Sequence, residues 1–250
     1  MTPISTRLCV TILTLTVGAC AYAQRVPDEV RSVRPFRTYA VGLRLGSGGI
    51  GGELATPLSQ HLDLRGGGQA FHYSTSFTTN GLNATGQLEL NNAYVAIGYF
   101  PFHSGFHITP GVTFHNRNNV SAVLNEPAGS TFTLNDVDYT SQANDPIKGN
   151  ASIVFGKMVA PRLTLGWGNM FPSGGRRFSF PVEVGAEYAS APVVTLAFSG
   201  SACTNQGCGS INTPENRANI AGEQNKLNAD LLPLRFYPIV SFGITYRLNR

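Results

Sequence analysis

The sequence is poor in charged residues. Asp, Glu, Lys and Arg make up 13% of its 250 residues, about half the share found in an ordinary globular protein. The formal net charge is +4, and the cations are scattered along the chain, so a nucleic-acid partner has no support. This composition suits strands, turns and a surface that does not face water on every side.

Long apolar runs are also absent beyond the first 23 residues. Residues 1–23 contain an early cation, Arg7, then the apolar run Leu8–Val17 and the triplet Ala21-Tyr22-Ala23. This is the pattern of a cleaved signal peptide. The alternative is a lipobox that ends in Cys20, which would then be acylated. Either leader predicts export, and no later segment approaches the roughly 20 apolar residues of a membrane helix.

Cysteine is scarce, with four residues in the whole chain. Only Cys203 and Cys208 are certain to remain after the leader is removed, and an exported compartment permits their oxidation. We therefore predict a local disulfide between them, with two free thiols as the alternative. Neighbouring residues do not supply further zinc ligands, and we expect no cofactor and no metal site.

What the sequence does contain is alternation of apolar and polar residues. Large apolar residues alternate with polar or small ones in Phe106–Arg117, Arg177–Tyr188 and Val240–Leu248. A barrel strand in lipid shows one side to the acyl chains and the other to the lumen. The predicted fold class is therefore all-β: an antiparallel up-and-down transmembrane β-barrel that follows a cleaved signal peptide.

About ten strands are expected, within a range of eight to twelve. A change in the side of the apolar residues predicts a bulge near Asn91-Asn92. The expected strands are Tyr39–Gly46, Ile50–Thr56, Leu62–Tyr73, Gln87–Phe100, Phe106–Arg117, Ala151–Val159, Arg162–Met170, Arg177–Tyr188, Val193–Gly200 and Val240–Leu248.

The predicted domain organisation has three parts: signal peptide 1–23, periplasmic lead-in 24–37 and barrel 38–250. An even strand number places both termini in the periplasm, with short turns there and long loops outside. Short turns are expected at Ala160-Pro161 and Ala189–Pro192. Long external loops are expected at 118–150 and 201–235, the second with a short helix within Pro214–Leu232.

Several sequence landmarks resemble those of a known class of protein. They include Gly42–Gly46, Gly51–Ser59, Tyr99–Phe102, Gly166–Asn169 and Tyr237–Arg247. On these residues the chain resembles an uncharacterised family of outer-membrane β-barrel proteins of Gram-negative bacteria, similar in architecture to the small OmpA, OmpW and OmpX barrels. The resemblance implies location in the cell outer membrane, contact with its lipids and insertion by the barrel-assembly machinery. It implies no catalytic residues.

Polar residues on the predicted lumen side carry both signs of charge. In a narrow barrel they can pair with one another, because an unpaired charge away from water is costly. His115 is the most plausible catalytic base, but it lacks a serine at short spacing. His103 and His107 would lie about 13 Å apart on a strand, too far to share a metal ion. The expected lumen residues are Arg44, Glu53, Asp63, Arg65, Gln69, Glu89, His107, His115, Glu183, Glu187 and Arg247.

The sequence supports three functional hypotheses. The first is a structural or surface-interaction protein, expected to be a monomer, which would bind an external ligand through its loops. The second is a narrow porin-like channel for small solutes or ions. The third and least favoured is a lipid-modifying barrel enzyme, and we expect no enzyme. A soluble, lipocalin-like periplasmic barrel is the alternative fold, with apolar residues inside and charged residues outside.

Overall fold

The computed structural model describes residues 35–79, 82–102, 104–171 and 176–248. The predicted signal peptide 1–23, Cys20 and most of the lead-in 24–37 lie outside the described residues. The described part belongs to one compact unit, Ser32–Arg250. Within it, no helix combines the length and apolar character needed to cross a bilayer.

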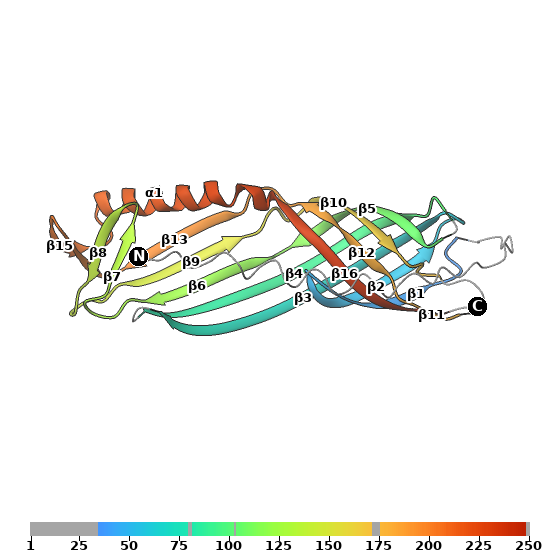
Figure 1. Ribbon diagram of the computed structural model, residues 1–250, viewed down its shortest axis with the longest axis horizontal. Coiled ribbons are helices and arrows are strands. Elements are labelled where there is room, and N and C mark those ends of the chain that lie inside the picture. Colours follow the sequence, from blue (N-terminus) through green and yellow to red (C-terminus); the bar gives the residue numbers. More distant parts are fainter. Residues whose placement is uncertain (1–34, 80–81, 103, 172–175, 249–250) are drawn as a thin grey trace, which may run out of the picture. The chain divides into compact units, whose positions relative to one another are not determined.

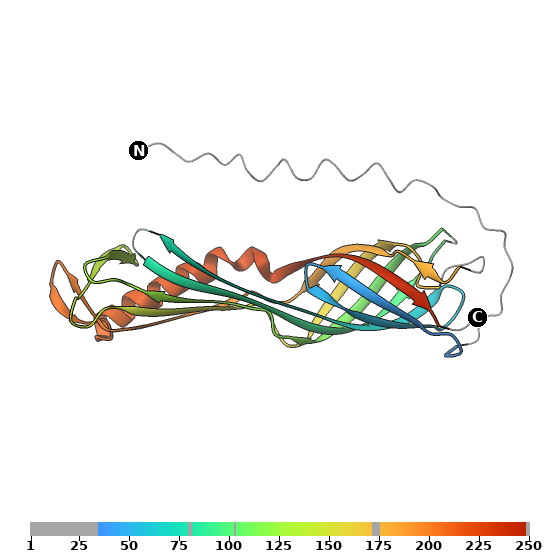
Figure 2. The same cartoon turned by 90° about the horizontal axis from the view of Figure 1, so that it is seen from below.

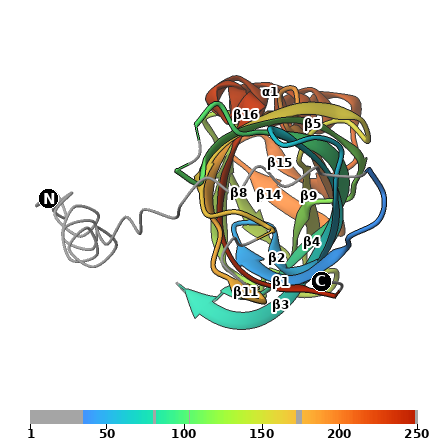
Figure 3. The same ribbon diagram turned by 90° about the vertical axis from the view of Figure 1, so that its right-hand side faces the viewer.

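Eight antiparallel strands close into a barrel (Figure 3). The ring closes because β1 pairs with β16 and β5 pairs with both β4 and β10. Ala40 pairs with Arg247, so β1 begins and β16 ends at the same end of the barrel. The eight strands are β1 (Ala40–Gly46), β2 (Gly49–Pro57), β3 (Leu62–Thr79), β4 (Leu82–Tyr99), β5 (Phe106–Asn116), β10 (Ala160–Trp167), β12 (Val182–Tyr188) and β16 (Phe236–Arg247).

The prediction of ten strands is wrong because two expected hairpin turns are bends. β9 (Lys148–Val154) leads into β10, and β12 leads into β13 (Val193–Ser199). β9 pairs with β13 just as β10 pairs with β12. Gly156 and Ser190 have positive φ angles of 79° and 69° at the two bends. Glycine, serine and proline at these points look like turn chemistry in the sequence, although the chain keeps its direction there.

β5 bends in the same way and continues as β6 (Asn119–Asn125). Beyond the bends, β3, β4, β6, β9 and β13 form a five-stranded sheet, which we call the extension together with the elements that pack on it (Figures 1 and 2). The segments predicted as long loops, 118–150 and 201–235, are largely strand and helix. The added elements are β7 (Thr131–Leu134), β8 (Val137–Ser141), β14 (Ser201–Thr204), β15 (Gly207–Ser210), α1 (Pro214–Asp230) and η1 (Leu232–Arg235), while the short β11 (Phe178–Ser179) pairs with β16.

Helix α1 lies where a helix was predicted and completes the edge of the extension. Its N-cap is Thr213, whose side chain accepts a hydrogen bond from Asn216 N. Gln224 Oε1 accepts from Leu196 N at 3.1 Å, and Asn228 Oδ1 accepts from Val194 N at 2.8 Å. Residues four apart on a helix rise about 6 Å and residues two apart on a strand about 7 Å. The two side-chain amides therefore match the free backbone edge of β13.

The polarity of the inner face reverses where the strands bend. Inside the barrel the buried residues include Arg44, Arg65 and Glu183, and large apolar side chains are exposed on the outside. In the extension the buried cluster is apolar and is centred on Tyr139 and Ile220. The soluble-barrel alternative requires an apolar lumen, and the structure contradicts it.

A bulge lies close to the expected position, between Ala93 and Tyr94 in the pairing of β4 with β5, but β4 itself carries no extra residue. β3 and β4 stay in one register from Leu62↔Tyr99 to Thr79↔Leu82. The apolar residues change side because β4 leaves the barrel: Leu88 lies on the inner face of the extension, whereas Val95 is exposed on the outside of the barrel. The extra residue is instead Phe114 on β5, between the pairs Tyr94↔Thr113 and Ala93↔His115.

Candidate functional site

The barrel interior is the densest polar region of the structure. Seven of the residues predicted to face the lumen are buried there, with exposed fractions of 8% or less. They are Arg44, Glu53, Arg65, His107, Glu183, Glu187 and Arg247. With Asp63 and Arg162, the interior holds four arginines and four carboxylates, so its formal charge balances apart from any proton on His107. Such balance lets a narrow barrel bury charge, because each ion has a counter-ion within reach.

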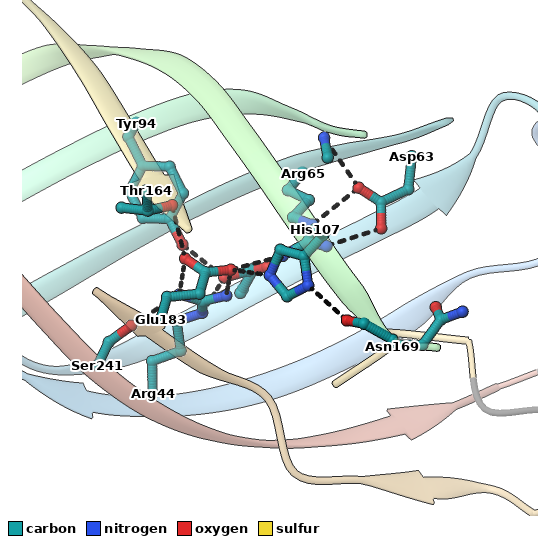
Figure 4. Close-up of polar contacts among 12 residues, drawn as sticks. Arg44, Asp63, Arg65, Tyr94, His107, Thr164, Asn169, Glu183 and Ser241 are labelled. Atoms are coloured by element: carbon teal, nitrogen blue, oxygen red, sulfur yellow. Dashed lines mark hydrogen bonds and ion pairs between the residues drawn. The ribbon is translucent and has the colours of Figure 1, made fainter. Parts of the chain in front are cut away.

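Glu183 on β12 is the centre of this network (Figure 4). Arg44 donates from both terminal nitrogens to its carboxylate, at 2.9 and 2.8 Å. Arg65 donates at 2.6 Å and Thr164 at 3.2 Å. His107 Nε2 lies 3.1 Å from Glu183 Oε1. Side chains from four other strands, β1, β3, β5 and β10, therefore converge on one carboxylate.

The two central arginines also contact two further carboxylates, those of Asp63 and Glu53. Arg65 forms a two-pronged pair with Asp63, with Nε at 2.8 Å and Nη2 at 3.0 Å from its oxygens. Arg44 Nε contacts Glu53, and Tyr94 donates its hydroxyl proton to the same carboxylate. Planar guanidinium groups suit this role because their donors match carboxylate geometry in two directions at once.

A second polar cluster lies where the barrel meets the extension. Thr113 donates to Glu187, and Arg162 stacks over the ring of Tyr94 at 3.8 Å from its centroid. The neighbouring cavity encloses about 20 Å³, space for about one water molecule. Its lining comprises Ser47, Gly48, Gln69, Asn92, Asn118, Arg162, Glu187, Tyr237 and Ile239. Together with the network around Glu183, these side chains occupy the interior of the barrel, as an eight-stranded barrel permits.

Inward-facing glycines make room for the network. A Cβ added at Gly166 would lie 2.3 Å from His107 Nε2, and one added at Gly98 would lie 2.2 Å from Asp63 Oδ1. Both distances are far below van der Waals contact, so only a residue without a side chain fits between these charged groups. The network thus depends on glycine as well as on the charged residues.

Two residues expected in the lumen face outward. Glu89 lies on the outer side of β4 above the barrel, where it contacts His72 at 3.6 Å. His115 faces outward because the extra residue Phe114 shifts the alternation of β5. His103 lies outside the described residues.

Some functional side chains were missed by the sequence analysis. Arg162, Thr164, Tyr94 and Ser241 all contact the network. Arg162 and Thr164 are spaced by two within one strand, so alternation alone could have found them once β10 was assigned the correct start.

The two cysteines form a disulfide away from this interior. Cys203 and Cys208 are cross-strand partners in the hairpin of β14 and β15, with Cα atoms 3.9 Å apart. The bond cross-links β14 and β15, which lie at one edge of the small four-stranded sheet of the extension. It is not connected to the charged network.

The fold is similar to that of two solved structures from Acinetobacter baumannii. CarO is 23% identical with a TM-score of 0.55, over 88% of this chain and 99% of that chain. CarO2 is 16% identical with a TM-score of 0.55, over 87% of this chain and 100% of that chain. Neither a protein-family model nor a curated protein matches the chain. These similarities concern the fold alone.

Proposed function

We propose that the chain is an outer-membrane protein whose barrel is a closed anchor for the extension, which forms an interaction surface outside the cell. The observation that carries this proposal is the reversal of polarity at the bends. Charge inside and apolar residues outside suit a lipid environment, and an apolar interior with a polar exterior suits water. The reversal therefore favours a boundary between lipid and water at the bends.

The filled lumen supports an anchor in preference to an open channel. Arg44, Arg65 and Glu183 lie across the interior and are joined by direct hydrogen bonds. A solute could pass only if these pairs separated, and separating buried, matched ions is costly. We expect a monomeric barrel, inserted by the barrel-assembly machinery, that does not conduct at rest.

The test begins with fractionation. The folded protein is expected to sediment with outer membranes and to migrate differently on a gel before and after boiling. Recovery as a soluble periplasmic protein would overturn the proposed location. In planar bilayers the purified protein is expected to be silent, whereas stable unitary current steps would overturn the closed anchor.

A narrow channel is the second candidate. It is favoured by the polar lumen and by the small cavity at the end nearest the extension, lined by Gln69, Asn92 and Arg162. In this case Glu183→Ala should increase the unitary conductance, because it removes the group that joins two arginines. An anchor that never opens predicts no current from the folded variant either.

We propose no enzymatic role. His115, the candidate base for lipid chemistry, lies on the outer side of the barrel and not within the charged network. Expression of the protein is expected to leave lipid A and phospholipid profiles unchanged. A new lipid product that disappears with His115→Ala would establish the enzyme hypothesis instead.

A further inference from the structure

Four chain segments lie side by side where the barrel meets the extension. Arg117 N donates to Asn91 O at 2.8 Å, and Phe155 N to Asn118 O at 2.9 Å. Two further hydrogen bonds join the next segments: Lys157 N donates to Ala189 O at 2.8 Å, and Ala189 N donates to Arg235 O at 2.9 Å. We call this row the belt; it comprises residues 114–118, 155–159, 188–190 and 232–236.

The belt presents three exposed cations, Arg117, Lys157 and Arg235. Neighbouring strands are about 4.8 Å apart, so the backbone positions of the three span about 15 Å. None of them takes part in an ion pair within the described part of the chain. Glu89, two positions before Asn91, has its carboxylate 3.6 Å from His72 Nδ1. The three cations are therefore free to bind an anion.

An apolar rim follows the belt on its barrel side. Phe114, Val159, Tyr188 and Phe236 are all large, apolar or aromatic, and about half exposed or more. Phe114 lies on β5, Val159 directly precedes β10, Tyr188 ends β12 and Phe236 begins β16. Cations directly above exposed apolar residues match an amphiphile with an anionic head.

We propose that the belt binds the phosphate groups of a phosphorylated glycolipid in the outer leaflet, with the acyl chains against the apolar rim. This inference rests on the proposed function, which makes the belt the outer membrane interface. Arginine binds phosphate through two parallel donors, and long cationic side chains extend from an apolar surface toward headgroups. A lipid phosphate held by side chains from adjacent strands would also brace the bends.

The test compares two triple variants refolded into phosphatidylcholine vesicles that contain bis-phosphorylated lipid A. The belt variant is Arg117→Gln, Lys157→Gln and Arg235→Gln. The control variant removes three charges from the extension: Lys148→Gln, Arg217→Gln and Lys226→Gln. Each cation near a membrane surface contributes about fivefold in affinity, so the belt variant should bind lipid A about a hundredfold more weakly. The control should bind as the unmodified protein does.

Three results would overturn the lipid site. They are equal losses in both variants, equal binding of lipid A stripped of its phosphates, or displacement of the lipid by inorganic phosphate at matched phosphate concentration. Boiling-dependent mobility on a gel verifies that each variant is folded. Because binding is measured on refolded barrels, failure of the lipid site is distinguishable from failure of the proposed location, which is decided by fractionation of cells.

Discussion

Individual side chains in the lumen contribute to stability through their shared partners. The carboxylate of Glu183 accepts hydrogen bonds from Arg44, Arg65 and Thr164, with donor–acceptor distances of 2.6 to 3.2 Å. The ring of His107 lies beside it. Removing a charge from such a group affects every partner at once, because each arginine is buried and needs a counter-ion. Removing a neutral partner affects one hydrogen bond alone.

We predict that Glu183→Gln destabilises the barrel by about 3–5 kcal/mol, the typical effect of leaving a buried charge without its partner. Urea unfolding of the detergent-folded protein, followed by the gel shift, measures this change. Thr164→Val is the matched control, since it removes one hydroxyl donor to the same carboxylate and should cost about 1 kcal/mol. Similar midpoints for the two variants would show that Glu183 is not central.

The inward glycines lead to a second prediction. Gly166→Ala should destabilise the barrel, because the new Cβ would lie 2.3 Å from His107 Nε2 and overpacking typically costs about 1–3 kcal/mol. Gly52→Ala is the control, since the nearest atom to its added Cβ is Gly42 O at 3.8 Å. The same unfolding assay applies, and a larger loss for Gly52→Ala would contradict the account.

Among the elements, α1 covers the edge strand of the extension. An open strand edge is a template for unwanted pairing with other chains, and β13 is protected by side chains of Gln224 and Asn228. The sheet is thereby closed by a helix whose amides replace the missing strand.

We predict that Gln224→Met combined with Asn228→Leu loosens α1 from β13. The two substitutions keep similar side-chain volumes but remove both hydrogen-bond acceptors. The N–H groups of Val194 and Leu196 are then unpaired, and each costs about 1–3 kcal/mol of stability where it is buried. Hydrogen exchange should become faster at these two amides. Asn225→Leu, on the exposed side of the helix, is the control and should leave exchange unchanged.

The disulfide belongs to a separate element, the β14–β15 hairpin. Reduction, or Cys203→Ser with Cys208→Ser, should destabilise the extension by about 2 kcal/mol, from the chain entropy of a closed loop of about six residues. Hydrogen exchange in β14 and β15 should become faster while the unfolding midpoint of the barrel stays constant. A lowered barrel midpoint would show that the two parts unfold together.

In the molecule as a whole, the reversal of polarity separates the barrel, which suits lipid, from the extension, which suits water. Three single cysteines in a Cys203→Ser, Cys208→Ser background can locate the boundary. With a membrane-impermeant maleimide on intact cells, Asn225→Cys in the extension should be labelled. Leu163→Cys on the outer barrel face should be protected, since its side chain would lie in lipid. Ser104→Cys should react only after the outer membrane is permeabilised.

Equal labelling at all three positions would contradict the proposed orientation. Labelling of Ser104→Cys in place of Asn225→Cys would invert it. The control for folding is the boiling-dependent gel shift of each variant, which reports the closed barrel independently of the label.

The sequence by itself determined the all-β class, most of the strand positions and most of the buried charged residues, because alternation is a local property of a strand with two unlike faces. Arg44, Arg65, Glu183 and Glu187 could be placed on the lumen side in this way. Their pairing could not, since Arg44 and Glu183 are 139 residues apart and come together only when the ring closes.

Only the tertiary structure decided the strand number and the sides of Glu89 and His115. Gly156 and Ser190 suit a bend and a hairpin turn equally well, because both need the same local backbone conformation. A hairpin differs from a bend in its pairing: in a hairpin the next segment pairs with the previous one, and in a bend it pairs with a third strand. Likewise, the apolar side of β4 changes because its surroundings change from lumen to extension, not because its backbone shifts. The alternation of residues shows that a strand has two unlike faces, and only the fold determines whether each face contacts the lumen, the lipid or the rest of the extension.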